Sequence, residues 1–351
     1  MSILGLETSC DDTCAAVIES DGRIRANVIS SQGIHDSFGG VVPEIASRHH
    51  LELVNMVVEE ALSAAGMTLD DVDLVAATQG PGLVGALLVG LSTGKALAAA
   101  RLLPFAAVDH LQGHVAANFL RSRESDEDSG RAAFEPPFVC LIASGGHTLL
   151  AHVREQDGFE VLGRTLDDAA GEAFDKGARM LGLGYPGGPA LERLAAGGDP
   201  EAFSFPGSRG DRARGGRGTS RQAFARSLDF SFAGVKTALL YRLEELAPVN
   251  DQVRADLAAS YQAAIVDNLL ERVQRAIELT GCERLAVGGG VAANGALRAR
   301  LAELDVTLRV PARVLCTDNA AMIASAARYS EQLAYPDYLG LDAYATGERA
   351  R

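Results

Sequence analysis

Two histidines with a helical spacing are the first candidates for chemistry in this sequence. His110 and His114 stand four residues apart, and at that spacing both imidazole rings project from one face of an α-helix. Two neutral imidazoles on one face can bind a transition-metal ion. Position 111 is leucine, so the His-Glu-x-x-His motif of zinc peptidases is absent, together with its general base. The spacing fits a packed or surface histidine pair equally well, and a metal site would need a third ligand from far away in the sequence.

Four aspartates are candidates for that ligand or for other acid chemistry. Asp318 follows the strand-like run 308–310 and lies where a helix is expected to begin. Its alternative role is to cap that helix, because aspartate at a helix start accepts hydrogen bonds from first-turn amides. Asp11 and Asp12 lie in a turn between two expected strands, and Asp175 lies in a later helical segment. Each is expected to be a solvated acid in isolation, but gathered in one site they could orient a metal and a phosphate-bearing ligand.

Glycine-rich turns next to strands could bind an anion. The run SGGHT (144–148) joins two apolar segments as a β-hairpin turn would, and glycine there leaves backbone N–H groups open to an anion. A plain tight turn is the alternative. The run GGG (288–290) follows a strand and precedes an expected helix at 292–304, which favours phosphate or nucleoside binding at the helix amino terminus. A dinucleotide site is disfavoured, because the next strand lacks the acidic residue that such a site needs.

The elements that must position these residues occur in a repeated order. Three strand-like runs at 3–7, 15–19 and 24–30 precede the helix 43–65, whose apolar residues recur at i, i+3, i+4 and i+7. Strands then alternate with helices. After residue 137 three strand-like runs begin again, so the sequence predicts a duplicated α/β architecture. The segment 90–95 has too few residues between its glycines for a Walker loop, and we expect a simple helix there.

The length of 351 residues favours two domains. We expect an amino-terminal domain at 1–122 and a carboxyl-terminal domain at 137–333, and leave open whether the last helix, 317–331, packs back on the first domain. The remaining segments are predicted to be two long loops and a tail, at 123–136, 207–226 and 334–351.

Composition limits the class of protein. With 32 basic and 46 acidic residues the net charge is −14, which argues against a broad nucleic-acid binder. The arginine-rich stretch 207–226 is a local exception, where basic side chains could contact phosphate groups. Five cysteines without Cys-x-x-Cys spacing indicate reduced cytoplasmic thiols. We expect no signal peptide, because no basic stretch precedes an apolar core at the amino terminus. We expect no membrane span, because glycine and proline at 80–82 interrupt the uncharged run 74–94.

Seven short strings, in order along the chain, resemble the TsaD family, the tRNA threonylcarbamoyladenosine transferases once labelled O-sialoglycoprotein endopeptidases. They are ETSCDDT (7–13), GGVVPE (39–44), DHLQGH (109–114), SGGHT (144–148), DDAAGEAFDK (167–176), YPGGP (185–189) and CTDN (316–319).

The resemblance implies a fold and a reaction. The fold is the actin-like fold of sugar kinases and Hsp70, with two duplicated α/β domains and a ligand in the cleft between them. The reaction moves the threonylcarbamoyl group from threonylcarbamoyl-AMP to the N6 amine of the adenosine that follows the anticodon in tRNAs reading codons that begin with A.

The resemblance also assigns roles by motif. One metal ion per subunit is implied, with iron(II) favoured and zinc as the alternative, bound by His110, His114 and Asp318. Asp11 matches the catalytic-site acid. The substrate-binding positions of the family correspond to Ile142, Ala143, Ser144, Gly145, Gly146, Asp175, Gly188 and Asn294.

The family further implies a cytoplasmic enzyme with a TsaB-like subunit and a TsaE-like ATPase as partners. The helix 43–65 is a candidate for the TsaB-type interface, because Ile45, Leu51 and Met56 lie off its main apolar stripe. Asp12 departs from the family, which often has glutamate there, and the acidic stretch 124–128 and the arginine-rich stretch look longer than the usual loops. We expect the arginine-rich stretch to contact tRNA phosphates. An actin-like ATPase or small-molecule kinase is the alternative function, and a metallopeptidase is a weaker one.

Overall fold

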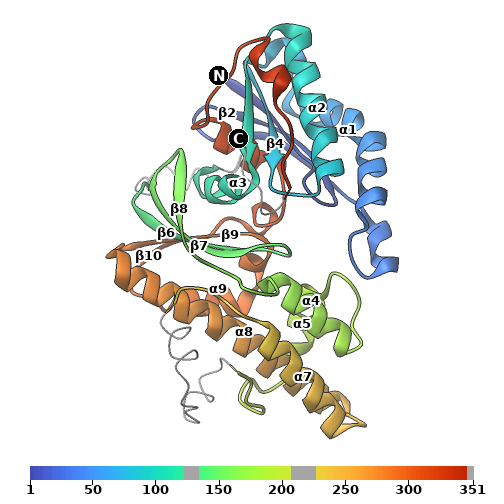
Figure 1. Ribbon diagram of the computed structural model, residues 1–351, viewed down its shortest axis with the longest axis vertical. Coiled ribbons are helices and arrows are strands. Elements are labelled where there is room, and N and C mark those ends of the chain that lie inside the picture. The colour runs from blue at the N-terminus through green and yellow to red at the C-terminus, as the bar shows by residue number, and fades with distance from the viewer. Residues whose placement is uncertain (122–133, 207–226, 346–351) are drawn as a thin grey trace. The chain divides into compact units, whose positions relative to one another are not determined.

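The computed structural model describes residues 1–121, 134–206 and 227–345 (Figure 1). The acidic stretch 124–128 and the arginine-rich stretch 207–226, on which two predictions fall, lie outside these ranges. The chain forms two compact units. The first comprises Met1–Glu135, Gln156–Gly158 and Val314–Arg351, and the second comprises Pro136–Glu155 and Phe159–Arg313.

The first unit is built on a five-stranded mixed sheet with the strand order β3-β2-β1-β4-β5. The central strand β1 runs antiparallel to β2 and parallel to β4, and most residues of these three strands are buried, as expected for a sheet covered on both faces. The strands span Ser2–Glu7 (β1), Asp12–Glu19 (β2), Ile24–Ser31 (β3), Leu74–Gly80 (β4) and Phe105–Asp109 (β5).

Alternate side chains of this sheet form two separate cores. Leu4 and Leu6 pack on one face with the helices α1 (Pro43–Ala65) and α2 (Val84–Arg101). Ile3 packs on the opposite face with α10 (Ala320–Ala327), and α3 (His110–Ala116) packs against α10. The helix α10 consists of small residues and Met and Ile, all buried. It approaches β1 so closely that a Cβ on Gly5 would lie 2.5 Å from the carbonyl oxygen of Ala320.

The second unit repeats the strand arrangement of the first. Its sheet has the order β10-β9-β6-β7-β8, with β6 antiparallel to β7 and parallel to β9. Its strands are Phe138–Ala143 (β6), Thr148–Glu155 (β7), Gly158–Arg164 (β8), Arg284–Gly288 (β9) and Thr307–Arg309 (β10). Its helices are Ala170–Met180 (α4), Gly187–Ala195 (α5), Ala233–Leu246 (α7), Asp251–Thr280 (α8) and Gly295–Leu301 (α9). The predicted duplication is therefore present at the level of strand order.

The structure differs from the expected elements at one place. The expected helix at 292–304 is instead a 3-10 turn, Gly290–Ala293, followed by α9, because the side chain of Asn294 accepts a hydrogen bond from Leu297 N and begins a new helix. The packing of the last helix, which the sequence left open, is on the first unit, to which the chain returns after Arg313. The return follows from the packing of α10 on β1 and β2.

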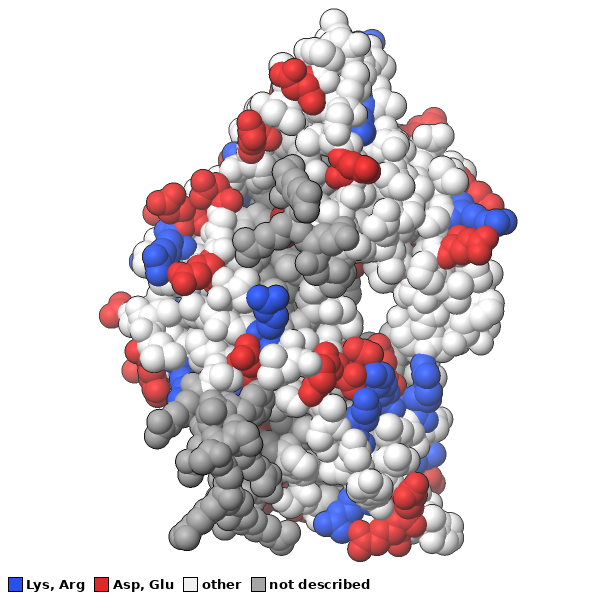
Figure 2. Space-filling model, viewed as in Figure 1, with Lys and Arg blue, Asp and Glu red and all other residues white. Residues whose placement is uncertain are grey.

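The uncharged run 74–94 contains the strand β4 and the first part of the helix α2. Within the described ranges, no helix combines the length and apolar character needed to cross a bilayer. On the face shown in Figure 2, acidic and basic side chains of the described residues are interspersed without a broad basic area, in keeping with the net charge of −14.

Candidate metal centre

The helix α3 carries both histidines and begins directly at the end of β5. Asp109 is its N-cap, and its Oδ1 accepts hydrogen bonds from Leu111 N at 2.8 Å and from Gln112 N at 3.0 Å. The rings of His110 and His114 lie one turn apart, with centroids separated by 4.8 Å. The predicted common face is thus formed by a capped helix whose position is set by a buried strand.

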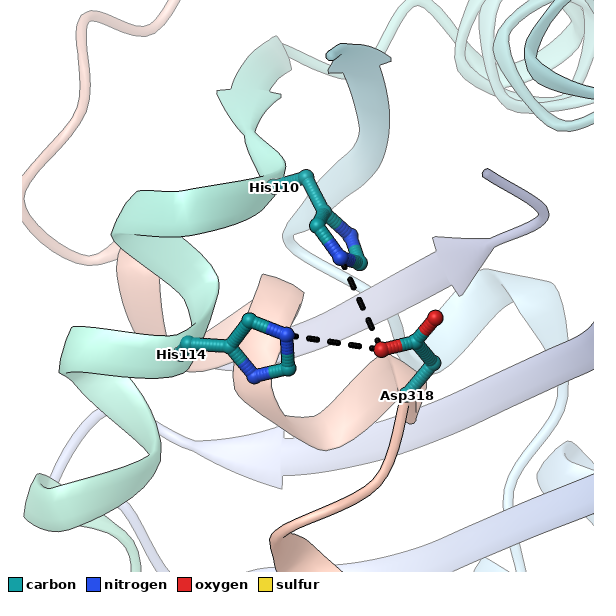
Figure 3. Close-up of side chains that lie close together, drawn as sticks. All are labelled: His110, His114 and Asp318. Atoms are coloured by element: carbon teal, nitrogen blue, oxygen red, sulfur yellow. Dashed lines mark ion pairs between the residues drawn. The ribbon is translucent and has the colours of Figure 1, made fainter. Parts of the chain in front are cut away.

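Asp318 meets the two histidines from the segment that leads into α10. Its Oδ1 lies 3.5 Å from Nε2 of His110 and 3.4 Å from Nε2 of His114 (Figure 3). One ligand atom from each of the three residues lies within 4.8 Å of the others. The capping of α10, the alternative role considered for Asp318, belongs to Asn319, whose Oδ1 accepts a hydrogen bond from Met322 N.

A buried carboxylate fixes the orientation of His110. Glu7, at the end of β1, is fully buried, and its Oε2 lies 3.0 Å from His110 Nδ1 and accepts a hydrogen bond from the Thr78 hydroxyl at 2.6 Å. The backbone N–H of Ser9 donates to the other oxygen. When Nδ1–H donates to Glu7, the lone pair of Nε2 faces Asp318, which is the tautomer that a metal ligand requires.

The charges around His110 alter two pKa values. Burial opposes the charged imidazolium, but the carboxylates of Asp318 and Glu7 outweigh it and raise the pKa of His110 to about 9. Burial likewise disfavours the Glu7 carboxylate, yet the nearby His110 holds its pKa below the usual value. A metal ion would therefore compete with a proton for this site.

His114 provides the clearest indication that the cluster fits a cation. Its side chain is fully buried, and neither ring nitrogen has a hydrogen-bond partner among the residues that the structure describes. An unsatisfied buried polar group costs about 1–3 kcal/mol. A metal ion at Nε2 would satisfy that nitrogen, and two imidazoles with one carboxylate suit iron(II) or zinc while leaving coordination positions open.

Asp11 belongs to the turn between β1 and β2 rather than to the three-residue cluster. This turn is anchored by His50, which lies 3.0 Å from the Cys10 carbonyl oxygen through Nε2 and 2.8 Å from the Thr13 hydroxyl through Nδ1. The adjacent Asp12 is half-buried, and burial, with smaller contributions from nearby carboxylates, raises the pKa of its carboxyl group to about 7.

The expected substrate-binding turn lies in the second unit, at the carboxyl end of β6. Ile142 and Ala143 end this strand, and the turn closes with a hydrogen bond from Ser144 N to the His147 carbonyl at 2.8 Å. The predicted hairpin is thus present. A Cβ on Gly145 or Gly146 would meet no described atom within 4 Å, so packing does not require glycine here and the space beside the turn is open.

The helix α4 connects this turn to the other expected substrate-binding residues. Gly171 N donates to the Ser144 carbonyl at 3.1 Å, and one turn later, on the same face, Asp175 Oδ1 accepts from the N–H groups of Gly187 and Gly188 at 2.8 and 3.2 Å. Burial raises the pKa of Asp175 in spite of these hydrogen bonds. The structure thereby brings the turn and the start of α5 to one face of α4.

Asn294, the last of these residues, caps α9 and donates through Nδ2 to Gln262 Oε1 at 2.9 Å. The following amide, Gly295 N, donates to Glu192 Oε1 on α5 at 2.8 Å. Asn294 therefore lies beside α5 within the second unit.

Glu7, Thr78 and Asp109 support the cluster without any sequence pattern having predicted such a role, although Glu7 and Asp109 each open one of the recognised strings. The signal for Glu7 was an acidic residue that ends an otherwise apolar strand, a position where a carboxylate is rarely buried without a partner. The partner, His110, is 103 residues away.

A cavity of about 400 Å³ lies at the opposite end of the second sheet, where β6 and β9 begin. Its lining contains none of the expected site residues and consists of Pro137, His152, Arg154, Thr280, Gly281, Cys282, Glu283 and Arg284.

Solved structures with a similar fold were found at low sequence identity. Component A of the (R)-2-hydroxyglutaryl-CoA dehydratase of Acidaminococcus fermentans matches with a TM-score of 0.53 and 16% identity, over 94% of this chain and 97% of that one. Full-length HypF matches with a TM-score of 0.54 and 12% identity, over 93% of this chain and 55% of that one. These likenesses concern the fold alone, and they confirm the predicted actin-like class with two α/β domains.

Sequence relatives are far closer. A protein of Symbiobacterium thermophilum named tRNA N6-adenosine threonylcarbamoyltransferase is 51% identical over 332 residues, which cover 93% of this chain and 91% of the relative. A protein of the same name from Clostridium perfringens is 46% identical over 333 residues, covering 93% and 92%. The family model described as tRNA N6-adenosine threonylcarbamoyltransferase matches residues 23–325. The chain therefore belongs to the TsaD family of tRNA N6-adenosine threonylcarbamoyltransferases, which are transferases that modify tRNA.

Proposed function

We propose that this member of the family takes the threonylcarbamoyl group from threonylcarbamoyl-AMP and that His110, His114 and Asp318 hold one metal ion for the transfer. The acceptor is the N6 amine of adenosine 37 of tRNA. The observation that carries the metal assignment is the fully buried His114, whose ring nitrogens have no hydrogen-bond partner among the described residues while Nε2 faces Asp318.

The reaction needs positioning more than activation. The donor is a mixed anhydride and already reactive, so the protein must hold it and bring up the amine. A bound iron(II) or zinc ion would act as a Lewis acid toward an oxygen of the donor. Glu7 keeps the proton of His110 on Nδ1. Gly145 and Gly146 are exposed, and their backbone amides are suited to stabilise negative charge that develops on the ligand.

Asp11 is proposed as the catalytic-site acid. Its turn is held by the His50 contact to Cys10 and by the hydrogen bond from Gln32 N to the Asp11 carbonyl at 3.2 Å. A carboxylate on such an anchored turn could accept the proton that the N6 amine loses when it is acylated. Asp175, Gly188 and Asn294 are proposed to bind the nucleotide part of the donor. Their support is the shared location beside α4 and α5.

Iron(II) is the favoured metal and zinc the alternative, as the family resemblance implies. The donor set of two imidazoles and one carboxylate suits both metals. Metal analysis of protein purified without oxygen distinguishes them. The enzyme is proposed to act in the cytoplasm.

A TsaB-like subunit and a TsaE-like ATPase are proposed as partners, with α1 as part of the interface to the former. On this helix Val54, Val57 and Val58 are buried against the sheet. Leu51 and Met56 are 65% and 55% exposed, whereas Ile45 is half-buried. The two exposed side chains present apolar surface for a partner.

One experiment tests the reaction. Purified protein is mixed with threonylcarbamoyl-AMP and unmodified tRNA, with and without the partner proteins, and the tRNA nucleosides are analysed by mass spectrometry. We expect threonylcarbamoyladenosine with the wild type and with His152→Ala, a half-buried histidine on β7 away from the expected site residues, and a severe loss with His114→Ala. Equal product from His114→Ala would contradict the metal assignment. ATP turnover without any modified nucleoside would instead favour the kinase or ATPase alternative.

A further inference from the structure

The segment that follows α10 lies along the first unit, where it is drawn in red in Figure 1. We call residues 338–344 the C-terminal strap. Tyr338 is fully buried, and the centroid of its ring lies 5.4 Å from the ring centroid of Phe105 on β5. The ammonium of Lys95 on α2 donates to the carbonyl oxygens of Leu339 and Leu341 at 3.2 and 2.7 Å. The lysine of the segment 90–95 therefore holds this strap.

The last part of the strap lies against the carboxyl end of β4. Tyr344 N donates to the Gln79 carbonyl at 3.2 Å, and the Gln79 side chain donates to the Asp342 carbonyl at 2.9 Å. A Cβ on Gly80 would lie 2.5 Å from the Tyr344 carbonyl oxygen, so the close approach requires glycine. The Tyr344 hydroxyl lies 2.7 Å from Asp109 Oδ2 and 3.0 Å from the Gly80 carbonyl.

Asp109 thereby links the strap to the histidine helix. Its Oδ2 faces Tyr344, while its Oδ1 accepts the first-turn amides Leu111 N and Gln112 N of α3. The next residue is His110. We propose that Tyr344 is a positioning residue for the metal cluster. Its hydroxyl holds Asp109 in the capping position and so fixes the start of α3 and the directions of His110 and His114. The proposal deepens the proposed function and rests on it for the role of the two histidines.

The hydrogen bond of the Tyr344 hydroxyl is strong enough to affect the position of Asp109. A hydrogen bond to a carboxylate is about twice as strong as one between neutral groups, and Tyr344 has a single proton, for which the closer and charged Asp109 is the better acceptor. Burial and the charge of Asp109 raise the pKa of Tyr344, so the hydroxyl stays protonated. Because α3 spans only seven residues, its first turn depends strongly on the cap.

The test compares Tyr344→Phe with Tyr335→Phe, which removes a hydroxyl from a half-exposed tyrosine of the same carboxyl-terminal segment. Both full-length variants are titrated with Co²⁺, whose visible absorption reports ligand geometry. For Tyr344→Phe we expect an altered spectrum, Co²⁺ binding weaker by on the order of tenfold, and faster hydrogen exchange at the amides of Leu111 and Gln112. Tyr335→Phe should match the wild type in all three.

A purely structural role would lower the melting temperature of Tyr344→Phe and leave the Co²⁺ spectrum and affinity unchanged, and that result would overturn the proposal. A double-mutant cycle with Asp109→Asn adds a second criterion. If Tyr344 acts through Asp109, the two variants should have less than multiplicative effects on Co²⁺ affinity, whereas multiplicative effects would contradict it.

The experiment also separates this proposal from the proposed function. If the wild type bound no Co²⁺, the metal assignment would fail, and the exchange rates of the α3 amides would still decide whether Tyr344 fixes that helix. Unchanged exchange in Tyr344→Phe would then refute the positioning role by itself.

Discussion

His110 Nδ1 lies 3.0 Å from Oε2 of Glu7, which is fully buried at the end of the central strand of the first unit. Because Thr78 and Ser9 also donate to this carboxylate, it cannot rotate away from the histidine without losing several hydrogen bonds. The pair therefore presents Nε2 of His110 toward Asp318 in a fixed direction. Because this direction is set before a metal ion binds, it favours binding.

Glu7→Gln tests this relationship while keeping the shape of the side chain. We expect metal affinity to fall by about 10–100-fold, as for other partners of metal-bound histidines, because a neutral amide no longer supports the charge on the imidazole. The matched control is Glu44→Gln on the surface of α1, where the ion pair with Arg48 is exposed. Equal metal affinity in Glu7→Gln and Glu44→Gln would show that Glu7 only fills space.

Metal binding should depend on pH through His110. Its pKa of about 9 means that the metal-free site is protonated at neutral pH, so a metal ion must displace a proton. We expect affinity to rise by up to about tenfold per pH unit below pH 9 and then to level off. Calorimetric titrations in buffers of different ionisation enthalpy measure the released proton directly, and uptake without proton release at pH 7.5 would contradict the prediction.

Asp12 should make the fold less stable as the pH rises. Its pKa of about 7 lies above the usual value, chiefly because burial disfavours the carboxylate. A raised carboxyl pKa favours the folded state at low pH, and this contribution is lost progressively between about pH 4 and pH 7. Asp12→Asn should therefore raise the free energy of unfolding at pH 8 by a few kcal/mol, at about 1.4 kcal/mol per pKa unit, and have little effect near pH 4.

Urea unfolding at both pH values measures the effect of Asp12→Asn. The control is Asp305→Asn, because Asp305 is exposed and its substitution should change stability by less than about 0.5 kcal/mol at either pH. The same change at pH 4 and pH 8 would speak against a raised pKa at Asp12.

His114→Leu should separate metal binding from folding. In the metal-free protein the ring nitrogens of this buried histidine lack hydrogen-bond partners among the described residues, so an apolar replacement of similar size should leave stability unchanged or increase it. Metal binding and modification of tRNA should both be lost. Calorimetry of the metal-free proteins, with metal analysis of each, checks the two halves of this prediction, and a large destabilisation of the metal-free variant would refute the first.

Met56→Glu should prevent association with a TsaB-like subunit if α1 forms that interface. Because Met56 is 55% exposed, the isolated chain should keep its stability to within about 0.5 kcal/mol. The control is Leu279→Glu, an exposed apolar residue on α8 of the second unit. Size-exclusion chromatography of the mixed proteins gives the result, and an intact complex with Met56→Glu would exclude this part of α1 from the interface.

The local features of the protein could be predicted from its sequence alone. The spacing of His110 and His114 placed both rings on one helical face, because the period of the helix is a property of the backbone. The three strand-like runs at the start of each half predicted the duplicated sheet, because burial on both faces demands continuous apolar residues. Where local chemistry was misread, as in the helix expected at 292–304, a single side chain decided the outcome, since Asn294 ends one turn and begins another helix.

The residues that meet in space could not be predicted in this way. Asp318 reaches the histidines because α10 packs on β1 beside Gly5, and Asn319 takes the helix-capping role that was the alternative for Asp318. Glu7 and His110 are 103 residues apart, and Tyr344 and Asp109 are 235 apart. No local period connects such residues, because their proximity follows from strand order and helix packing, which depend on the whole chain.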